Sequence, residues 1–400
     1  MADVAQPQGL RNLHQAAPDH RWLRPFLRRT AGNDFVPVID GLRFYAIAAV
    51  LAYHIVYNLR GAGQLHVTQP WLWAAVQVAG GGFIGVNLFF AISGFILAVP
   101  FAGTHLNGRA PVRLSRYYLR RLTRLEPPYL LSLAVLFAVR TWVMGVDGLT
   151  PHLLASSVYL HNALYGYAST VSTVTWSLEV EVQFYLVAPL LGQLFRVRPT
   201  WLRRLCLVAL GLAVAYANAR IGRPAFAWLL PNLNYFLVGF LLADVHALEW
   251  KAGREVPNSA LWDGVATLGW ALIGWSSCRA PELFPLLPVF VLATYYAILR
   301  SRLWYWLTSR PLLYVFGGMC YTIYLYHNAL IRAVIERTPW VKTWNVALGG
   351  DAAWMLVVPL CLGAVLLVCV PLFVVVERPC MEPDWHRRAW RWVTRRVGAT

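Results

Sequence analysis

Ten apolar runs, each near the length of a membrane-spanning helix, follow one another along this chain of 400 residues. An α-helix needs about 20 predominantly apolar residues to cross the hydrocarbon core of a bilayer. The runs lie at 38–58, 80–100, 126–145, 176–195, 205–220, 226–246, 260–276, 283–299, 311–334 and 351–376. We therefore predict an all-α fold, a polytopic transmembrane helical bundle of about ten spanning helices.

The composition supports this class and disfavours a soluble enzyme or a disordered chain. Hydrophobic residues make up 58% of the chain and charged residues 13%, whereas a soluble domain is about half apolar and a quarter charged. The net charge of +17 is better explained as a signal that orients the chain in a membrane than as a nucleic-acid-binding surface. We therefore expect no nucleic-acid partner. The six cysteines show no paired spacing, and we expect neither a disulfide framework nor a metal site.

Basic residues are concentrated in alternate loops. The basic segments lie at 11–29, 109–124, 196–204, 251–254, 300–310 and 387–396, and the other loops carry only scattered charges. Because arginine and lysine accumulate in cytoplasmic loops, we expect a multi-pass protein of the plasma membrane with both termini in the cytoplasm. The chain then divides into a basic cytoplasmic tail at 1–36, a membrane domain at 37–379 and a second basic cytoplasmic tail at 380–400.

The first apolar run contains three ionisable residues, Asp40, Arg43 and His54. An ionisable side chain at the centre of a membrane helix costs about 2.5–3.5 kcal/mol, so each one suggests a function. Arg43 and His54 are eleven residues apart, which places them on one helix face, roughly 16 Å apart along the axis. A snorkelling arginine and a packed histidine are the alternative for each residue alone. The pair on one face, with Asp40 beside it, favours a functional site.

Three later runs contain further polar candidates. Ser93 lies in a glycine-rich run, where close helix packing also explains the small residues, and a nucleophilic serine would need a base within reach. Glu179 and Glu181 point to different helix faces, so at most one of them faces a given cavity. For either residue, the alternative to a functional role is an acid that stabilises the start of a helix. His327 follows Tyr324 by three residues and could equally be a packed interfacial histidine.

A basic segment lies between the second and third runs. Its arginines at 113, 116, 120 and 124 are at helical spacing and predict one basic stripe at the inner membrane surface. Such a stripe attracts anionic lipid heads, at about 1 kcal/mol per basic residue. A guanidinium also grips phosphate oxygens with two hydrogen bonds, so a phosphate clamp is the second interpretation. The charge density alone does not separate the two.

Six short motifs together resemble the family-3 membrane acyltransferases. They are D-G-L-R at 40–43 with His54 completing R-x10-H, G-V-N-L-F-F-A-I-S-G-F at 85–95, R-R-L-T-R at 120–124, T-W-S-L-E-V-E-V-Q-F-Y at 175–185, Y-L-Y-H at 324–327 and E-R-P at 377–379. They occur in the order typical of the family and span nearly the whole chain. Three positions depart from the family pattern: Asn87 where an acid is common, Cys320 where serine is common, and Glu179 as an additional acid.

The resemblance implies an integral membrane O-acyltransferase. Such an enzyme moves an acyl group, usually acetyl, from acyl-coenzyme A to a hydroxyl of a carbohydrate or glycosylated small molecule. Acyl-coenzyme A would be a co-substrate, and no permanently bound cofactor is implied. The candidate residues are His54, Arg43 and Glu181 for catalysis; Arg43, Arg116, Arg120, Arg121 and Arg124 for acyl-donor binding; and, in addition, Asp40, Ser93, Trp176, Glu179, Tyr324 and His327.

The chemistry is compatible with these positions. O-acylation needs a base that takes the proton of the attacking hydroxyl, and histidine serves near neutral pH. The phosphates of coenzyme A would meet arginines on the cytoplasmic side. A membrane transporter or flippase of an acylated or glycan substrate is the alternative, since buried charges are equally expected there. A membrane glycosyltransferase is a further rival, although residues 60–79 contain no acid.

Overall fold

The computed structural model describes residues 21–29, 36–221, 228–250, 259–337, 341, 343, 349–382 and 385. Every element within these ranges is helical, in agreement with the predicted all-α class. Most of the two predicted basic tails and the basic segment at 251–254 lie outside the described residues.

Eight helical segments of the described chain are long and apolar enough to cross a membrane. They are Pro37–Gly61, Pro70–Asn107, Leu114–Val143, Thr173–Arg196, Thr200–Asn218, Leu229–Glu249, Pro281–Ile298 and Gly350–Cys380. The other two predicted runs are also helical but differ in character. Helix α11 (Ala260–Cys278) contains Asp263 and several tryptophans, which make it less apolar. The run at 311–334 breaks at Met319 into α14 (Pro311–Gly318) and α15 (Cys320–Arg337).

The break at Met319 follows two glycines, which are poor helix formers, and α15 itself carries charged residues near its end. The total of ten spanning helices therefore remains a prediction, while the eight segments make the chain a multi-pass membrane protein by length and composition.

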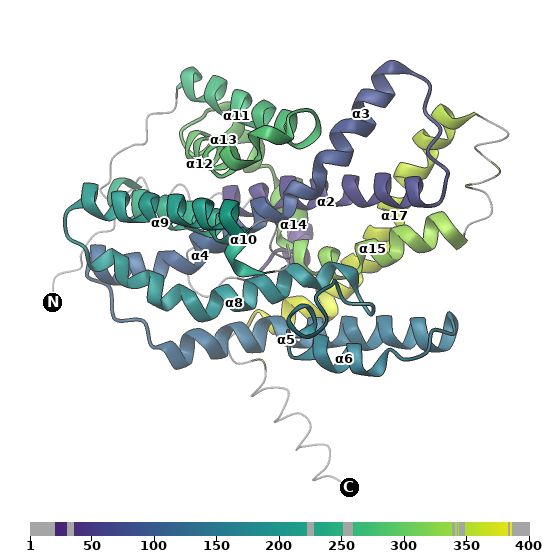
Figure 1. Ribbon diagram of the computed structural model, residues 1–400, viewed down its shortest axis with the longest axis horizontal. Helices are drawn as coiled ribbons and strands as arrows, with labels where there is room; N and C mark the ends of the chain where they lie inside the picture. The colour runs from purple at the N-terminus through teal and green to yellow at the C-terminus, as the bar shows by residue number, and fades with distance from the viewer. Residues whose placement is uncertain are drawn as a thin grey trace, which may run out of the picture.

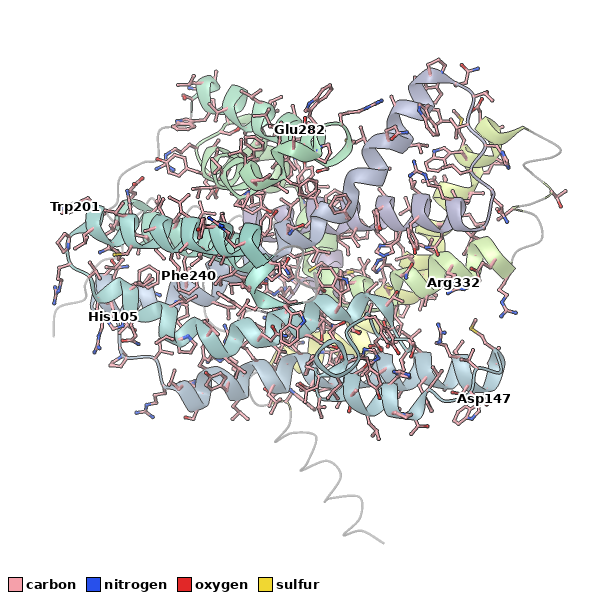
Figure 2. All side chains as sticks on the ribbon, viewed as in Figure 1. His105, Asp147, Trp201, Phe240, Glu282 and Arg332 are labelled. Atoms are coloured by element: carbon pink, nitrogen blue, oxygen red, sulfur yellow. The ribbon has the colours of Figure 1, made fainter. Side chains whose placement is uncertain are left out.

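Helix α2 (Pro37–Gly61) lies at the centre of the bundle and runs along its long axis (Figure 1). It packs against α4 (Gly85–Asn107), α14 and α15. Figure 2 shows His105 and Trp201 at one end of this axis and Asp147 and Arg332 at the other, with Phe240 inside the bundle. The end of α4 at His105 and the start of the segment Thr200–Asn218 at Trp201 therefore lie opposite the loop at Asp147 and the last turns of α15 at Arg332.

The remaining elements surround these central helices. Their bounds are η1 (Arg21–Phe26), α3 (Pro70–Gly80), η2 (Gly81–Ile84), α5 (Leu114–Ala138), η3 (Val139–Val143), α6 (Thr150–Ser157), α7 (His161–Tyr165), η4 (Thr173–Thr175), α8 (Trp176–Leu191), η5 (Gly192–Arg196), α9 (Thr200–Ile221), α10 (Leu229–Val245), η6 (His246–Trp250), η7 (Pro281–Leu286), α12 (Leu287–Ile298), α13 (Leu303–Thr308), α17 (Gly350–Leu372), η8 (Phe373–Glu377) and α18 (Arg378–Cys380). Helix α5 begins at Leu114, so the arginine segment is part of the same helix as the third apolar run.

Glycines allow close contact between α4 and α10. A Cβ atom on Gly94 would lie 2.3 Å from the carbonyl oxygen of Phe236, and one on Gly239 would lie 2.2 Å from the backbone nitrogen of Phe95. Membrane helices use small residues in this way because their backbones can then approach closely. The packing explanation of the glycines around Ser93 is therefore confirmed.

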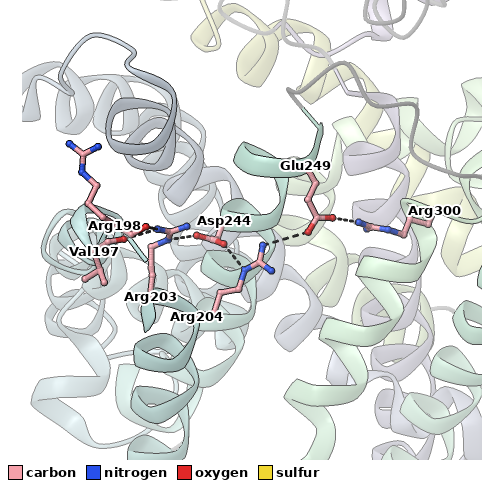
Figure 3. A network of polar contacts seen from close by, with 7 residues as sticks. All are labelled: Val197, Arg198, Arg203, Arg204, Asp244, Glu249 and Arg300. Carbon is pink, nitrogen blue, oxygen red and sulfur yellow. Dashed lines mark hydrogen bonds and ion pairs between the residues drawn. The ribbon is translucent and has the colours of Figure 1, made fainter. Parts of the chain in front are cut away.

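A buried ion network joins α9 to the ends of α10 and α12 (Figure 3). Asp244 is fully buried and accepts a hydrogen bond from Arg203 and another, at 2.8 Å, from Arg204. Arg204 also pairs with Glu249 at 3.5 Å, and Glu249 pairs in turn with Arg300. The buried carboxylate of Asp244 is thus paired with two arginines, which is the condition for burying a charge, while Glu249 at the other end of the network is 39% exposed.

Candidate active site

Two histidines from helices distant in the sequence meet inside the bundle. His54 lies on α2 and His327 on α15, and the two are 273 residues apart in the chain. The Nδ1 atom of His54 is 3.1 Å from Nε2 of His327. His327 is fully buried and His54 is half-buried. The packed-histidine interpretation therefore does not describe His327 fully, because its ring contacts the predicted catalytic residue.

The hydrogen-bond partners assign the protons on both rings. Nδ1 of His327 lies 2.8 Å from the carbonyl oxygen of Tyr324 and 3.2 Å from that of Ile323, and carbonyl oxygens only accept. A neutral His327 thus carries its proton on Nδ1 and accepts at Nε2. Nδ1 of His54 donates toward this nitrogen and toward the carbonyl oxygen of Val50 at 3.0 Å. Nε2 of His54 then keeps a free electron pair, which is what a general base requires.

The W-S-L and Y-L-Y-H motifs meet beside the histidines. The Ser177 and Tyr324 hydroxyls are 2.7 Å apart, and the Tyr324 hydroxyl donates to the carbonyl oxygen of Val174 at 3.1 Å. Trp176 is half-buried and packs edge-on against Phe90. These contacts fix the start of α8 against α15 and hold the turn of α15 that carries His327.

The two acids of α8 face different neighbours, as their spacing predicts. Glu181 accepts a hydrogen bond from the hydroxyl of Ser93 at 2.8 Å and is close enough to Arg43 to interact with it electrostatically. The base that a nucleophilic Ser93 would need is thus within reach. Glu179 instead accepts from the backbone N–H of Asn162 at 2.9 Å. It stabilises the start of α7, which is a structural role.

The segment that Glu179 holds is itself well ordered by hydrogen bonds. Nδ1 of His161 donates to the carbonyl oxygen of Tyr167 at 3.1 Å, and Nε2 of His161 lies 2.9 Å from Nδ1 of His152. Burial lowers the pKa of His161, so this ring is neutral at pH 7 and accepts from His152.

Asp40 and Arg43 form an ion pair that also includes Arg28, which the sequence motifs did not identify. Arg43 donates to Oδ1 of Asp40 at 2.5 Å, and Arg28 donates to the same oxygen at 2.9 Å. Asp40 is only 2% exposed. Burial, with the charges of Arg43 and Arg124, lowers the pKa of Arg28 to about 9, which leaves it charged at neutral pH. Arg28 belongs to the predicted N-terminal tail, where no sequence signal distinguishes it from the neighbouring arginines.

The E-R-P motif explains how Arg28 reaches this position. The guanidinium of Arg378 donates to the carbonyl oxygens of Leu27 and Arg24, each at 3.0 Å. These bonds hold the segment at 21–29 against the bundle. The neighbouring Glu377 accepts from the backbone N–H of Thr322 at 3.0 Å and so anchors the first turn of α15.

The predicted arginine stripe divides into an outer and an inner set. Arg116 and Arg120 are exposed, whereas Arg121 and Arg124 are half-buried. The guanidinium of Arg121 lies 4.0 Å above the ring of Tyr117, and Arg124 is close enough to Arg43 to interact with it electrostatically. Each step of four residues turns a helix by about 40°, so the side chains rotate from the surface toward the interior between 116 and 124. The stripe therefore continues from the surface at Arg116 and Arg120 to a half-buried position at Arg124.

Within the described residues, no group of three or more histidine, cysteine, aspartate or glutamate side chains is placed to hold a metal ion. The six cysteines are unpaired.

Comparison with known proteins decides the family. The model of an acyltransferase domain, acyltransferase family 3, matches residues 36–374. The chain belongs to acyltransferase family 3. Five of the six motifs lie within this match and E-R-P at 377–379 follows it, while both histidines and the Asp40–Arg43 pair lie inside it.

Relatives in the family carry acyltransferase names. The chain is 26% identical to the acyltransferase MdmB of Streptomyces mycarofaciens over 88% of its own length and 93% of the relative's. It is 31% identical to the peptidoglycan O-acetyltransferase OatA of Listeria monocytogenes over 41% of this chain and 25% of the relative. A putative O-acetyltransferase of Staphylococcus aureus is 24% identical over 75% of this chain and 51% of the relative.

The chain therefore spans about half the length or less of the O-acetyltransferases that it matches. No solved structure matches it. The names and the family model together make this chain an acyltransferase of the O-acetyltransferase type.

Proposed function

We propose that this protein transfers an acyl group, acetyl in the simplest case, from acyl-coenzyme A to a hydroxyl of a carbohydrate or glycosylated molecule, with His54 as the general base. The observation that carries the proposal is the hydrogen-bonded pair of His54 and His327. The pair leaves Nε2 of His54 with a free electron pair on a half-buried ring.

The reaction balances with this one base. The acceptor oxygen attacks the thioester carbonyl carbon while Nε2 of His54 takes the hydroxyl proton, so a C–O bond forms. Collapse of the tetrahedral intermediate breaks the C–S bond, and the proton passes from His54 to the departing thiolate. The products are the ester and free coenzyme A thiol. The protonated ring of His54 continues to donate through Nδ1 to His327, which stabilises the imidazolium.

The arginines are suited to hold the phosphates of the acyl donor. Arg43 lies three helical turns from His54 on the same helix, roughly 16 Å along the axis, which an extended pantetheine arm can span. Arg124 and Arg121 lie on the side of α5 that faces the bundle, and Arg116 and Arg120 lie on its exposed side. We assign the inner set to contact with the bound donor and the exposed set to its electrostatic capture.

The proposal of a carbohydrate acceptor rests on the names of the relatives. Two of them are named as peptidoglycan O-acetyltransferases, one from Listeria monocytogenes and a putative one from Bacillus subtilis, and both match about two fifths of this chain. The proposed acceptor class is accordingly a glycan hydroxyl, and the proposed location is the bacterial inner membrane.

The test uses purified protein in lipid nanodiscs with acetyl-coenzyme A and a panel of soluble oligosaccharides. Release of free thiol and the mass increase of the oligosaccharide are both recorded, because a transporter releases no thiol. In His54→Ala, transfer should fall by about 10²–10⁴-fold, the usual contribution of a general base. The exposed His66 supplies a matched control, His66→Ala, which should keep wild-type activity.

Wild-type transfer by a well-folded His54→Ala protein would overturn the assignment of the base. A mass increase without thiol release would overturn the assignment of acyl-coenzyme A as the donor. Thiol release without oligosaccharide modification would overturn the assignment of a carbohydrate as the acceptor.

A further inference from the structure

The surface next to His54 combines aromatic rings with amide side chains. On one side of the imidazole, the ring of Tyr53 lies 5.0 Å from that of His54, and the ring of Tyr57 lies 5.8 Å from that of Tyr53 at an angle of 30°. Tyr57 is 59% exposed. The two tyrosines therefore present an aromatic surface beside the proposed base, and part of this surface is open.

The side chains one helical turn beyond His54 are polar, and Asn58 donates to the backbone carbonyl oxygen of His54 at 2.7 Å. Asn58 donates to Oδ1 of Asn328 at 2.9 Å, and Asn328 donates to the hydroxyl of Thr173 at 3.0 Å. Both asparagines are half-buried and Thr173 is exposed. This polar strip, defined as Asn58, Asn328 and Thr173, joins α2, α15 and the turn before α8. It begins one helical turn from His54, toward the end of α2 at Gly61.

The strip is costly unless water or a ligand covers it. Polar side chains of membrane helices normally face the bundle interior or a water-filled cavity, because hydrocarbon satisfies none of their hydrogen bonds. The half-exposed asparagines therefore lead us to expect an aqueous opening that reaches His54 from this end of α2. None of the three side chains is charged, so the opening favours a neutral, hydroxyl-rich molecule over an ionic one.

We propose that Tyr53, Tyr57 and the polar strip form the acceptor subsite for a neutral sugar unit, whose hydroxyl is thereby presented to His54. A sugar ring has an apolar C–H face, which packs on aromatic rings, and a rim of hydroxyls, which pair with amides that both donate and accept. Binding sites with largely aromatic walls and a few placed polar groups have this composition. The inference rests on the proposed function and specifies which residues select the acceptor.

The kinetic test measures acetyl transfer in nanodiscs with N,N′,N″-triacetylchitotriose, a neutral trisaccharide called chitotriose below, as the acceptor probe and acetyl-coenzyme A as the acyl donor. Tyr57→Ala and Asn328→Ala should each raise the KM for chitotriose by about tenfold, because ring and amide contacts are worth about 1–1.5 kcal/mol each. The KM for acetyl-coenzyme A should stay within twofold of wild type. Tyr57→Phe keeps the ring and should stay close to wild type.

Tyr216 provides the matched control. It is also an exposed tyrosine, 62% against 59%, but it lies on α9. Tyr216→Ala should leave both KM values unchanged. An active wild type with Tyr57→Ala and Asn328→Ala indistinguishable from Tyr216→Ala would overturn the subsite alone. A wild type that acetylates neither chitotriose nor any other oligosaccharide would overturn the proposed function together with the subsite.

A labelling experiment tests the opening without relying on activity. Asn328→Cys in nanodiscs should react with a water-soluble maleimide above the background of the six native cysteines, and chitotriose should slow the reaction. Leu367→Cys is the control, because Leu367 is 78% exposed within the apolar segment Gly350–Cys380 and should face lipid. Equal labelling of the two variants, or no protection by chitotriose, would contradict the proposal.

Discussion

Two buried aspartates each accept hydrogen bonds from two arginines, yet their surroundings differ. Asp40 binds Arg28 and Arg43, and Asp244 binds Arg203 and Arg204. The Asp244 group continues through Glu249 to Arg300 and ties helix ends together (Figure 3). The Asp40 group instead lies on the helix that carries His54. The same residue types thus form a structural clamp in one place and part of the candidate site in the other, and only their neighbours distinguish the two.

The two groups also differ in how their charges are used. In the Asp244 group, Arg203 is 1% exposed, and one of its nitrogens donates to the carbonyl oxygen of Val197 at 2.6 Å. In the Asp40 group, both arginines donate to the same carboxylate oxygen, and Arg124 lies nearby. In the second arrangement three arginines lie around Asp40, and this is the group that we propose holds the phosphates of the acyl donor.

The largest expected effect is a loss of stability when the Asp244 group is broken. Asp244→Ala leaves the buried Arg203 without its partner, and breaking a buried ion pair costs about 3–5 kcal/mol of unfolding free energy. We expect a clear fall in the thermal midpoint, measured by the loss of the monodisperse peak on size-exclusion chromatography after heating. Glu336→Ala breaks the exposed Arg332–Glu336 pair and should cost less than about 0.5 kcal/mol. Equal midpoints for the two variants would refute the clamp.

The second expected effect is on acyl-donor binding, which should depend on the Asp40 group and not on the Asp244 group. Arg43→Ala and Arg204→Ala each remove one of two arginines from a buried aspartate, so their stability losses should be similar. Only Arg43→Ala should raise the KM for acetyl-coenzyme A, by about 10- to 150-fold, since a hydrogen bond to a charged group contributes about 1.5–3 kcal/mol. Initial rates over a series of acetyl-coenzyme A concentrations give this value. A similar rise in Arg204→Ala would remove the distinction.

The smallest effect concerns the two faces of α5. Arg120→Gln removes an exposed charge, and its effect on the KM for acetyl-coenzyme A should stay below about fivefold and vanish at high salt. Arg124→Gln removes a half-buried charge beside Arg43, and its larger rise in KM should persist at high salt, because buried charges are screened less. The same salt dependence for both variants would show that the inner and outer arginines act alike.

The sequence led to several parts of the candidate site through its motifs. It singled out His54, Arg43 and Asp40 because ionisable residues in an apolar run are costly, and it placed Glu179 and Glu181 on different faces because the helical period requires it. It could not identify Arg28, which looks like any other residue of a basic tail. It also treated the arginines of α5 as one surface stripe, since their rotation toward the interior depends on what packs against the helix.

What the sequence determined by itself was the class of protein and the position of most helices. A bilayer imposes a fixed length and apolarity on each span, and both properties can be recognised along a single chain. Only the tertiary structure decided that His327 orients His54, that Arg28 completes the Asp40 pair and that Asn328 lies beside the proposed base. These contacts join residues up to 273 positions apart. They depend on how helices pack, which the periodicity of one helix does not contain.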